Sequence, residues 1–454
     1  MLVRSVPVFI LDTTVETVSG PLSYGKIARF WLPLMAAWLM MAVEGPFLAA
    51  VIARMAGEQV NLAAYGVAYA FGLVAESPVI MLMSASTALC RDRESYRRLR
   101  TFSQLLCLGV TLVLCLFLLP GIFSLVAEGL IGLPPAVADL TRQALLCLLP
   151  WPAAIGIRRF YQGVLIAAHQ TRRVAAGTCL RVVSMAGTAL LLYRSGLLPG
   201  AEVGALALTA GVVAEAMFTR LMARHEIRRL CDLEPPPAAE IASYRALWSY
   251  YLPLALTPFI GLSIHPLVTF FLGQSPQALE SLAVMPVLYG LTFIFRAMGL
   301  SYQEVAIALL GENREHYAKV RNFAAGLGIL TSLCLGLIAF SPLNLIWFED
   351  VSGLSRELAN FAVLPLQIMA IFPALTVLIC FQRAVLIVGR VTRPISFATG
   401  VEAMAIFALL LLVVVWFSVP GAVAAAVAYV IGRLLAVAVL KRSITFGQAK
   451  RSLA

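Results

Sequence analysis

Six ionisable side chains lie near the middle of long apolar segments. They are Arg158, Arg159, Arg296, Arg383, Glu44 and Glu76. A charge at the centre of a bilayer costs at least ~2.5–3.5 kcal/mol, so membrane proteins direct such groups towards protein or water. Guanidinium groups bind phosphate and carboxylate through two parallel hydrogen bonds. The excess of arginine over glutamate therefore predicts a cavity that accepts an anionic solute.

The candidate site residues fall into two groups. Those expected to contact the solute are Arg158, Arg159, Gln162, Arg296 and Arg383. Those expected to act in ion coupling or gating are Glu44, Glu76, His265, Pro33 and Pro253. Because neighbouring residues on a helix point ~100° apart, at most one of Arg158 and Arg159 is expected to face the cavity centre. Glu215 and Glu402 fall in outer spans, where we expect hydrogen bonds to neighbouring helices.

Several of these assignments have a structural alternative. Glu76 and Arg296 occupy equivalent places in two halves of the chain, so they either line opposite walls of one cavity or close on each other as a locking ion pair. Arg383 either faces the cavity or extends to the membrane surface, as Arg433 is expected to do. His265 either titrates or packs between helices.

Prolines interrupt the first and seventh apolar segments. They are Pro33, Pro46, Pro253, Pro258 and Pro266. Proline removes a backbone hydrogen bond and clashes with the preceding turn. Membrane helices tolerate this where neighbouring protein or water satisfies the freed carbonyl. The matched positions predict either helices that bend during function or static kinks that serve packing.

The composition is that of a membrane protein. The chain has 454 residues, of which 61% are hydrophobic and 13% are charged, and its mean hydropathy is +0.91. Soluble domains carry about 25% charged residues. The formal charge of +11 comes from basic residues in short loops between apolar runs, which does not call for a nucleic-acid partner.

Enzyme and cofactor signatures are missing from the sequence. The eight cysteines are scattered without CxxC spacing, so neither a disulfide framework nor a zinc site is predicted. The chain shows no nucleotide-binding glycine loop, no HExxH and no paired metal-ligand spacing. We therefore expect no enzyme activity, no metal and no cofactor.

The sequence predicts an all-α polytopic membrane protein with twelve transmembrane helices in two pseudo-symmetric six-helix bundles. About 20 apolar residues cross the hydrocarbon core. The expected spans are 25–53, 62–88, 102–130, 137–167, 172–195, 200–219, 246–272, 279–308, 322–348, 357–388, 394–417 and 419–440. The expected domains are a lead-in (1–23), a first lobe (24–219), a linker (220–245), a second lobe (246–440) and a tail (441–454).

Lysine and arginine are distributed unequally between the two sides. Of the 34, 25 fall in the segments on the side of the termini, four fall on the opposite side, and five lie within spans. The positive-inside rule then predicts cytoplasmic termini in an inner (plasma) membrane. We expect a monomer that contacts membrane lipids.

The two halves repeat each other at an offset of about 221 residues. Arg93-Glu94-Ser95-Tyr96 returns as Arg314-Glu315-His316-Tyr317, and Pro199-Gly200-Ala201 returns as Pro420-Gly421-Ala422. Two parallel repeats in an apolar chain are typical of transporters built from two bundles around one cavity. The basic repeated element is expected to form a membrane-surface helix, or alternatively a regulatory or recruiting site.

A segment after the fourth span of each half carries a family resemblance. Gln162-Gly163-Val164-Leu165 leads to Thr171-Arg172, and Gln382-Arg383-Ala384-Val385-Leu386 leads to Thr392-Arg393, followed by Pro394. With the two six-helix halves, this resembles the multidrug/oligosaccharidyl-lipid/polysaccharide (MOP) exporter superfamily, which includes the multidrug and toxin extrusion (MATE) transporters. The first copy lacks the proline.

Other short segments are similar to the progressive ankylosis family of membrane exporters. They are Ala64-Tyr65-Gly66-Val67-Ala68-Tyr69, Tyr251-Leu252-Pro253-Leu254-Ala255-Leu256, Ala370-Ile371-Phe372-Pro373 and Glu44. This resemblance implies export of a small anion such as pyrophosphate, a nucleoside triphosphate or citrate. Because no nucleotide-binding loop is found, we expect the energy to come from the substrate itself or from the gradient of a coupling ion, a proton or sodium. The alternatives are a flippase for lipid-linked precursors and a proton- or sodium-coupled multidrug antiporter.

Overall fold

The computed structural model describes residues 22–52, 54–131, 133–232, 243–311, 315–352, 354–416 and 419–452. These residues form helices joined by short turns, and twelve helical spans are long and apolar enough to cross a membrane. The predicted all-α, twelve-span architecture is confirmed. Most of the expected lead-in and residues 233–242 of the expected linker lie outside the described residues.

The first lobe holds six spans. Its elements are α1 (Tyr24–Ile52), α2 (Glu58–Glu76), η1 (Ser77–Val79), α3 (Leu82–Leu89), α4 (Arg93–Phe117), α5 (Pro120–Ser124), η2 (Leu125–Leu130), α6 (Pro135–Cys147), α7 (Trp151–Ala167), α8 (Thr171–Ser195), α9 (Gly200–Met222) and α10 (Arg224–Asp232). The second span consists of α2, η1 and α3, and the fourth consists of α6 and α7.

The second lobe repeats this order. Its elements are α11 (Tyr244–Gln274), α12 (Ala278–Leu309), α13 (Tyr317–Ala339), α14 (Leu343–Leu345), η3 (Ile346–Val351), α15 (Arg356–Ile368), η4 (Met369–Ile371), α16 (Phe372–Val388), α17 (Arg393–Trp416) and α18 (Gly421–Ser452). The last helix continues into the segment expected to be a tail.

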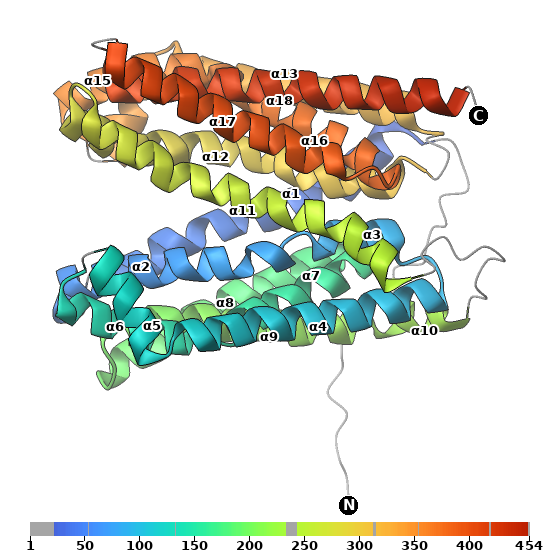
Figure 1. Ribbon diagram of the computed structural model, residues 1–454, viewed down its shortest axis with the longest axis horizontal. Coiled ribbons are helices and arrows are strands. Elements are labelled where there is room, and N and C mark those ends of the chain that lie inside the picture. The colour runs from blue at the N-terminus through green and yellow to red at the C-terminus, as the bar shows by residue number, and fades with distance from the viewer. Residues whose placement is uncertain are drawn as a thin grey trace, which may run out of the picture.

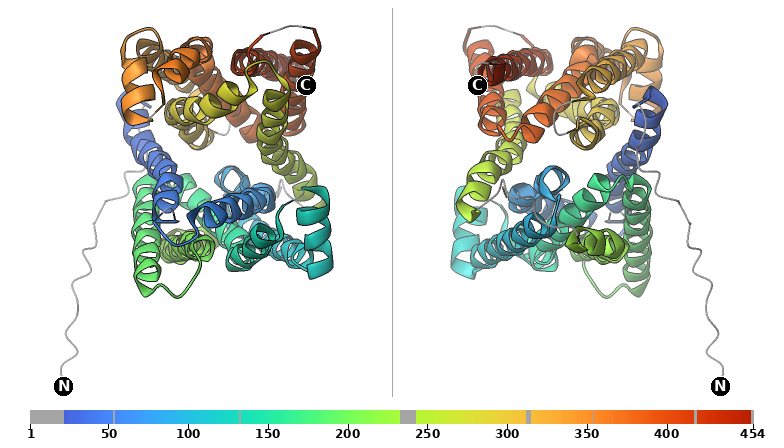
Figure 2. Two further views of the ribbon diagram at one scale, coloured as in Figure 1. Left: turned by 90° about the vertical axis from the view of Figure 1, so that its left-hand side faces the viewer. Right: turned by 90° about the vertical axis from the view of Figure 1, so that its right-hand side faces the viewer.

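The two lobes lie one above the other, and their first helices cross between them (Figures 1 and 2). Helix α1 packs against α8 of its own lobe and also against α12 of the other. Helix α11 packs against α17 of its own lobe and also against η1 of the other. Each lobe thus packs against part of the first helix of the other lobe.

Equivalent contacts recur in both lobes. The Asn61 side-chain carbonyl accepts a hydrogen bond from the Ala201 amide at 2.9 Å, and the Ser281 hydroxyl accepts one from the Ala422 amide at 3.0 Å. Both tie the start of a sixth span to the start of a second span. A π-helical turn follows the third span in each lobe, as η2 and η3. The internal repeat read from short motifs is therefore a repeat of tertiary contacts.

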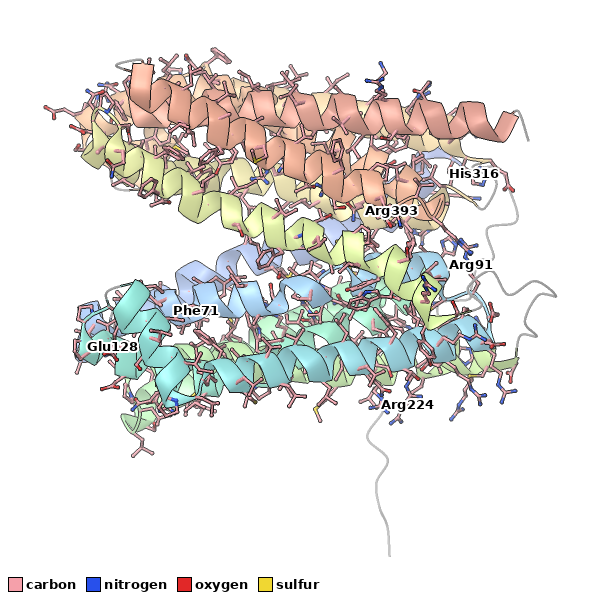
Figure 3. The ribbon with its side chains drawn as sticks, viewed as in Figure 1. Phe71, Arg91, Glu128, Arg224, His316 and Arg393 are labelled. Carbon is pink, nitrogen blue, oxygen red and sulfur yellow. The ribbon has the colours of Figure 1, made fainter. Side chains whose placement is uncertain are left out.

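Basic side chains gather at one end of the bundle, which we call the basic face. Arg91, Arg224, His316 and Arg393 lie there, whereas Glu128 lies at the opposite end (Figure 3). The C-terminal helix end lies on the same side as the basic face (Figure 1).

The repeated basic element is not a separate surface helix. It forms the first turns of the spanning helices α4 and α13. The Asp92 carboxylate caps α4 by accepting from the amides of Glu94 at 2.8 Å and Ser95 at 2.9 Å. This cap starts the helix at Arg93, nine residues earlier than hydropathy suggests. The third and ninth spans accordingly end earlier than expected, at Phe117 and Ala339.

Pro33 and Pro253 do not interrupt the helices that contain them. Residues 24–52, which include Pro33, form one continuous helix, and residues 244–274, which include Pro253, form another. The Thr257 hydroxyl donates to the Pro253 carbonyl at 3.0 Å. Whether these helices bend during function stays a prediction.

The lobes are joined in the half of the bundle next to the basic face. One hydrophobic cluster runs from the first lobe into residues such as Tyr302, Val305 and Leu310 of the second. The part of the second lobe away from the basic face forms a separate cluster that includes Leu288 and Phe348. In this conformation the two lobes therefore share a hydrophobic core next to the basic face.

Close helix packing in the first lobe depends on glycine. A Cβ at Gly163 would lie 1.7 Å from the Ser86 hydroxyl oxygen and 2.4 Å from the Met83 carbonyl oxygen. Helix α7 can approach α3 this closely only because the position has no side chain.

We predict that Gly163→Ala lowers the thermal unfolding midpoint in detergent, because overpacking costs about 1–3 kcal/mol. Gly187→Ala in α8 is the control, since its Cβ would meet no atom within 4 Å. Equal midpoints for the two variants would contradict the close packing described here.

Candidate functional site

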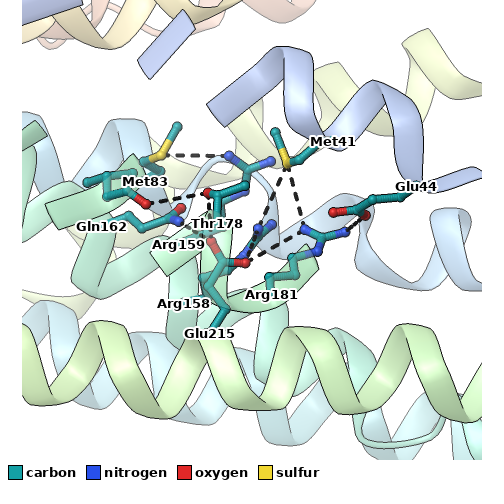
Figure 4. Close-up of polar contacts among 10 residues, drawn as sticks. Met41, Glu44, Met83, Arg158, Arg159, Gln162, Thr178, Arg181 and Glu215 are labelled. Carbon is teal, nitrogen blue, oxygen red and sulfur yellow. Dashed lines mark hydrogen bonds and ion pairs between the residues drawn. The ribbon is translucent and has the colours of Figure 1, made fainter. Parts of the chain in front are cut away.

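A buried network of charges occupies the interior of the first lobe (Figure 4). The Arg158 guanidinium on α7 donates to the Glu215 carboxylate on α9 at 2.7 Å, and both side chains are almost fully buried. Glu215 also accepts from Gln162 and Thr178, each at 3.0 Å. Arg158 and Gln162 reach the same carboxylate because residues four apart share one helix face.

Arg181 extends this network and was missed by the sequence analysis, which counted it with a loop. It lies in α8, pairs with Glu44 on α1, and comes within 3.8 Å of Glu215. The corrected count places 24 basic residues on the side of the termini and six within spans. The sequence held a signal for Arg181, because Thr178 and Arg181 are three residues apart and so place two polar side chains on one face of an expected span.

Arg158 and Arg159 point in different directions. Arg158 turns into the lobe towards Glu215, whereas Arg159 turns towards Met83 (Figure 4). The Arg159 guanidinium lies 5.8 Å from the centre of the Trp38 ring and is half-buried. In this conformation Arg158 and Gln162 are held by Glu215, and both also line the pocket that Arg159 lines.

Arg159 lines a pocket formed by both lobes. The cavity is small, about 20 Å³, which is room for about one water molecule. Its walls include Trp38, Met41, Met83, Arg159, Ser301 and Glu304. Because Ser301 and Glu304 come from α12, this space belongs to the boundary between the lobes.

Glu76 and Arg296 do not form an ion pair. Both are half-buried, but the positive charges that act most strongly on Glu76 are Arg159 and Arg158. Among the described residues, the Glu76 carboxylate makes no hydrogen bond. The locking pair considered from the sequence is thus not present in this conformation.

The second lobe gathers three arginines around one carboxylate. Arg433 on α18 pairs with Glu402 on α17 at 2.9 Å. The Arg296 and Arg433 guanidinium groups lie 4.7 and 5.1 Å from the centre of the Phe372 ring. The expectation that Arg433 extends to the membrane surface is wrong, because a buried carboxylate and an aromatic face hold it inside the lobe.

Arg383 also stays inside the second lobe. Its guanidinium donates to the Thr399 hydroxyl at 2.9 Å, and its Nε is buried without a partner. The Nε of Arg296 is likewise buried without a partner. Among the described residues, neither arginine has a carboxylate within ion-pair distance.

His265 lies on an exposed part of α11, close enough to feel the charges of Arg296 and Arg433 without contacting either. Its ring packs edge-on against Tyr289, with the ring centres 5.0 Å apart. The structure therefore does not bring His265 into the cluster of Arg296 and Arg383 by direct contact.

The charges of the two lobes differ. In the first lobe three arginines (158, 159, 181) face three glutamates (44, 76, 215). In the second, Arg296, Arg383 and Arg433 lie near Glu402, and the only further buried glutamate described in that lobe is Glu304, at its boundary with the first lobe. The surplus of guanidinium is thus located in the second lobe. Residues that could form a metal site, three His, Cys, Asp or Glu together, are not found in the described part of the chain.

No protein-family model matches the sequence, and no curated protein matches it. Solved structures do match over almost the whole chain. A multidrug resistance MATE family transporter in an outward-facing conformation is 17% identical, with a TM-score of 0.75 and coverage of 94% of this chain and 96% of that one. A Vibrio cholerae MATE transporter is 15% identical, with a TM-score of 0.73 and coverage of 93% and 97%.

A third match is a MOP superfamily transporter from Pyrococcus furiosus, whose binding pocket is described as having reverse polarity that suggests a different function. It is 14% identical, with a TM-score of 0.74 and coverage of 94% of this chain and 95% of that one. At these identities the matches show the fold, which is that of the MATE-like transporters. The similarity to the progressive ankylosis family stays a prediction.

We predict that Glu215→Gln strongly destabilises the protein, because Arg158 would lose its only ion-pair partner while staying buried. Removing one partner of a buried pair costs about 3–5 kcal/mol. Glu76→Gln is the control, as it removes no hydrogen bond in the described structure. Thermal unfolding in detergent measures both, and similar midpoints would show that the buried network does not depend on Glu215.

Proposed function

We propose that this chain is a secondary transporter that exports a small anionic solute by alternating access between its lobes. The observation that carries the proposal is the set of half-buried guanidinium groups without a carboxylate partner among the described residues. They are Arg159, Arg296 and Arg383. A twelve-helix, two-lobe fold shared with transporters supplies the scaffold for alternating access.

Unpaired guanidinium inside a membrane protein favours an anion as the missing partner. Each such group has lost hydration and gains charge-assisted hydrogen bonds when phosphate or carboxylate arrives. The planar guanidinium also fits these groups in two-pronged geometry. Pyrophosphate, a nucleotide and citrate are the candidate solutes.

The orientation that we propose places the basic face in the cytoplasm of a cell with this protein in its inner (plasma) membrane. The basic residues of the connecting segments gather at that face, as the positive-inside rule requires. Because the lobes share a core on the basic side, this conformation would be closed to the cytoplasm.

Two alternatives have support from particular observations. A multidrug antiporter is favoured by Glu76, which is half-buried and free to meet a cation, and by the neighbours with this fold. However, a Pyrococcus furiosus neighbour is described with a pocket of reverse polarity, so one fold accommodates different pocket charges. A flippase for lipid-linked precursors would use the same arginines for a pyrophosphate headgroup.

We predict that Arg296→Gln and Arg383→Gln each slow anion efflux from proteoliposomes by about tenfold or more. A hydrogen bond to a charged group contributes about 1.5–3 kcal/mol, which sets this magnitude. The liposomes contain labelled pyrophosphate, ATP or citrate. Arg296→Lys should restore part of the rate, because it keeps the charge but loses the planar geometry.

Arg194→Gln is the matched control for these variants, since Arg194 is exposed at the end of α8. Efflux of an organic cation or transfer of a lipid pyrophosphate, with no anion efflux, would replace the proposal by the corresponding alternative. Equal anion efflux for wild type and both glutamine variants would remove these arginines from the site.

We predict that Pro253→Ala slows transport without lowering the yield of folded protein, because a more regular α11 resists bending. Pro286→Ala in α12 is the comparison, as it removes a proline from another spanning helix. Turnover per folded molecule in proteoliposomes measures the effect. Unchanged turnover for Pro253→Ala would identify a static role.

A further inference from the structure

The first helix of each lobe contacts the other lobe through an aromatic hydrogen-bond donor, and the two contacts are equivalent. The Trp31 indole donates to the Met298 carbonyl at 3.2 Å, and the Tyr251 hydroxyl donates to the Pro78 carbonyl at 2.6 Å. Trp31 and Tyr251 are 220 residues apart, as are Pro78 and Met298. Each donor therefore reaches the second span of the opposite lobe at an equivalent place.

Aromatic packing repeats this symmetry. Trp31 packs edge-on against Phe323 with ring centres 6.0 Å apart, and Tyr251 packs edge-on against Phe102 at 5.1 Å. These contacts hold the halves of the lobes next to the basic face together. Opening on that face requires that they separate.

A buried carboxylate lies at the centre of this arrangement. The Ser84 hydroxyl on α3 donates to the Glu304 carboxylate on α12 at 2.5 Å, and these two residues are themselves 220 apart. The Gln303 amide donates to Ser84 at 3.2 Å. Glu304 thus bridges the lobes at the place where equivalent residues meet.

Glu304 has no ionic partner among the described residues. It is 4% exposed, and one of its carboxylate oxygens is buried without any donor. The ionisable groups that interact with it are Arg159 on α7, Tyr250 on α11 and Cys380 on α16. None is within ion-pair or hydrogen-bond distance, and the donors that reach the carboxylate are the Ser84 hydroxyl on α3 and, at 3.5 Å, the Gln303 amide on α12.

We propose that Glu304 is a proton-binding site that links closure of the basic face to proton uptake. On closure the carboxylate leaves water, takes one proton from the solution at the basic face and becomes a neutral acid. On opening it returns that proton to the same solution. An isolated buried carboxylate is far more costly than a neutral one, which gives the direction of the coupling.

The sign of the pH dependence follows. Because the closed form holds the proton, acid favours closure of the basic face, and rising pH favours its opening. One proton changes the ratio of closed to open forms by at most about tenfold per pH unit. The inference rests on the proposed alternating access but does not depend on which solute is carried.

The test measures distances between spin labels on the two lobes in lipid nanodiscs without added anion substrate. The labels are attached at Arg97→Cys and Ala318→Cys, which are exposed in the first turns of α4 and α13, after the eight native cysteines are replaced. In wild type we expect the short-distance population to fall as pH rises from about 5 to about 9. In Glu304→Gln, which keeps a polar group but cannot titrate, we expect the short distance at every pH.

The control is His169→Gln, which removes a second ionisable group near α1. His169 packs on Phe30 with ring centres 5.3 Å apart, and burial lowers its pKa. Its replacement should leave the pH response intact. Two outcomes would overturn the assignment: Glu304→Gln keeps the wild-type pH midpoint of the distance change, or only His169→Gln loses it.

Two further variants apply if Glu304→Gln does not fold. Glu304→Asp should keep a pH response with a changed midpoint, and Ser84→Ala should move the population towards the open form. An unchanged profile in both would overturn the proposal, as would a population that follows sodium at constant ionic strength rather than pH. Because no anion is present, failure of anion transport and failure of this switch are separate results.

Discussion

The cost of an unpaired charge inside a membrane determines how the interior of this protein is arranged. In the first lobe, Arg158 and Arg181 are paired with Glu215 and Glu44, so their charges are compensated inside the helix bundle. The charges left half-buried, Arg159, Arg296 and Arg383, are those without such a partner among the described residues. The same energetic rule thus separates charges that are paired within a lobe from charges that have no carboxylate partner among the described residues.

The repeat supplies a frame in which the two lobes can exchange contacts without unfolding. Each first helix begins against the opposite lobe, and its aromatic residue bonds a carbonyl there. A few hydrogen bonds and edge-on ring contacts can be broken and reformed, whereas each lobe keeps its own packed interior. Placing a carboxylate at this boundary makes closure sensitive to a proton. An ionised Glu304 would also oppose an anion at Arg159 in the same pocket, so proton and anion would favour the same state.

Hydropathy and internal repetition were sufficient to predict the twelve spans and two lobes, because both depend on local composition and on short motifs. They failed where a cap overrides hydropathy, as Asp92 does by starting α4 within the basic segment. Site residues were harder to predict. Arg296 and Arg383 could be identified as buried charges, but their partners come from distant helices, and Arg433 was misread because Glu402 and Phe372 are remote in sequence. Glu304 gave no signal, since its environment is formed by the other lobe.

The repeat also shows how an asymmetric site can arise on a symmetric scaffold. Glu76 corresponds to Arg296, and Arg181 corresponds to Glu402, so two polar positions were kept while the sign of the charge was reversed. Each lobe nevertheless has a buried ion pair between its fifth and sixth spans. In the first lobe this pair joins Arg181 to Glu215, and in the second it joins Glu402 to Arg433. The balance of the surrounding charges differs, because the second lobe holds Arg296 and Arg383 without a carboxylate within ion-pair distance among the described residues, while its added carboxylate, Glu304, lies at the boundary with the first lobe. Under the proposed anion transport, this surplus of positive charge would orient an anion towards the second lobe.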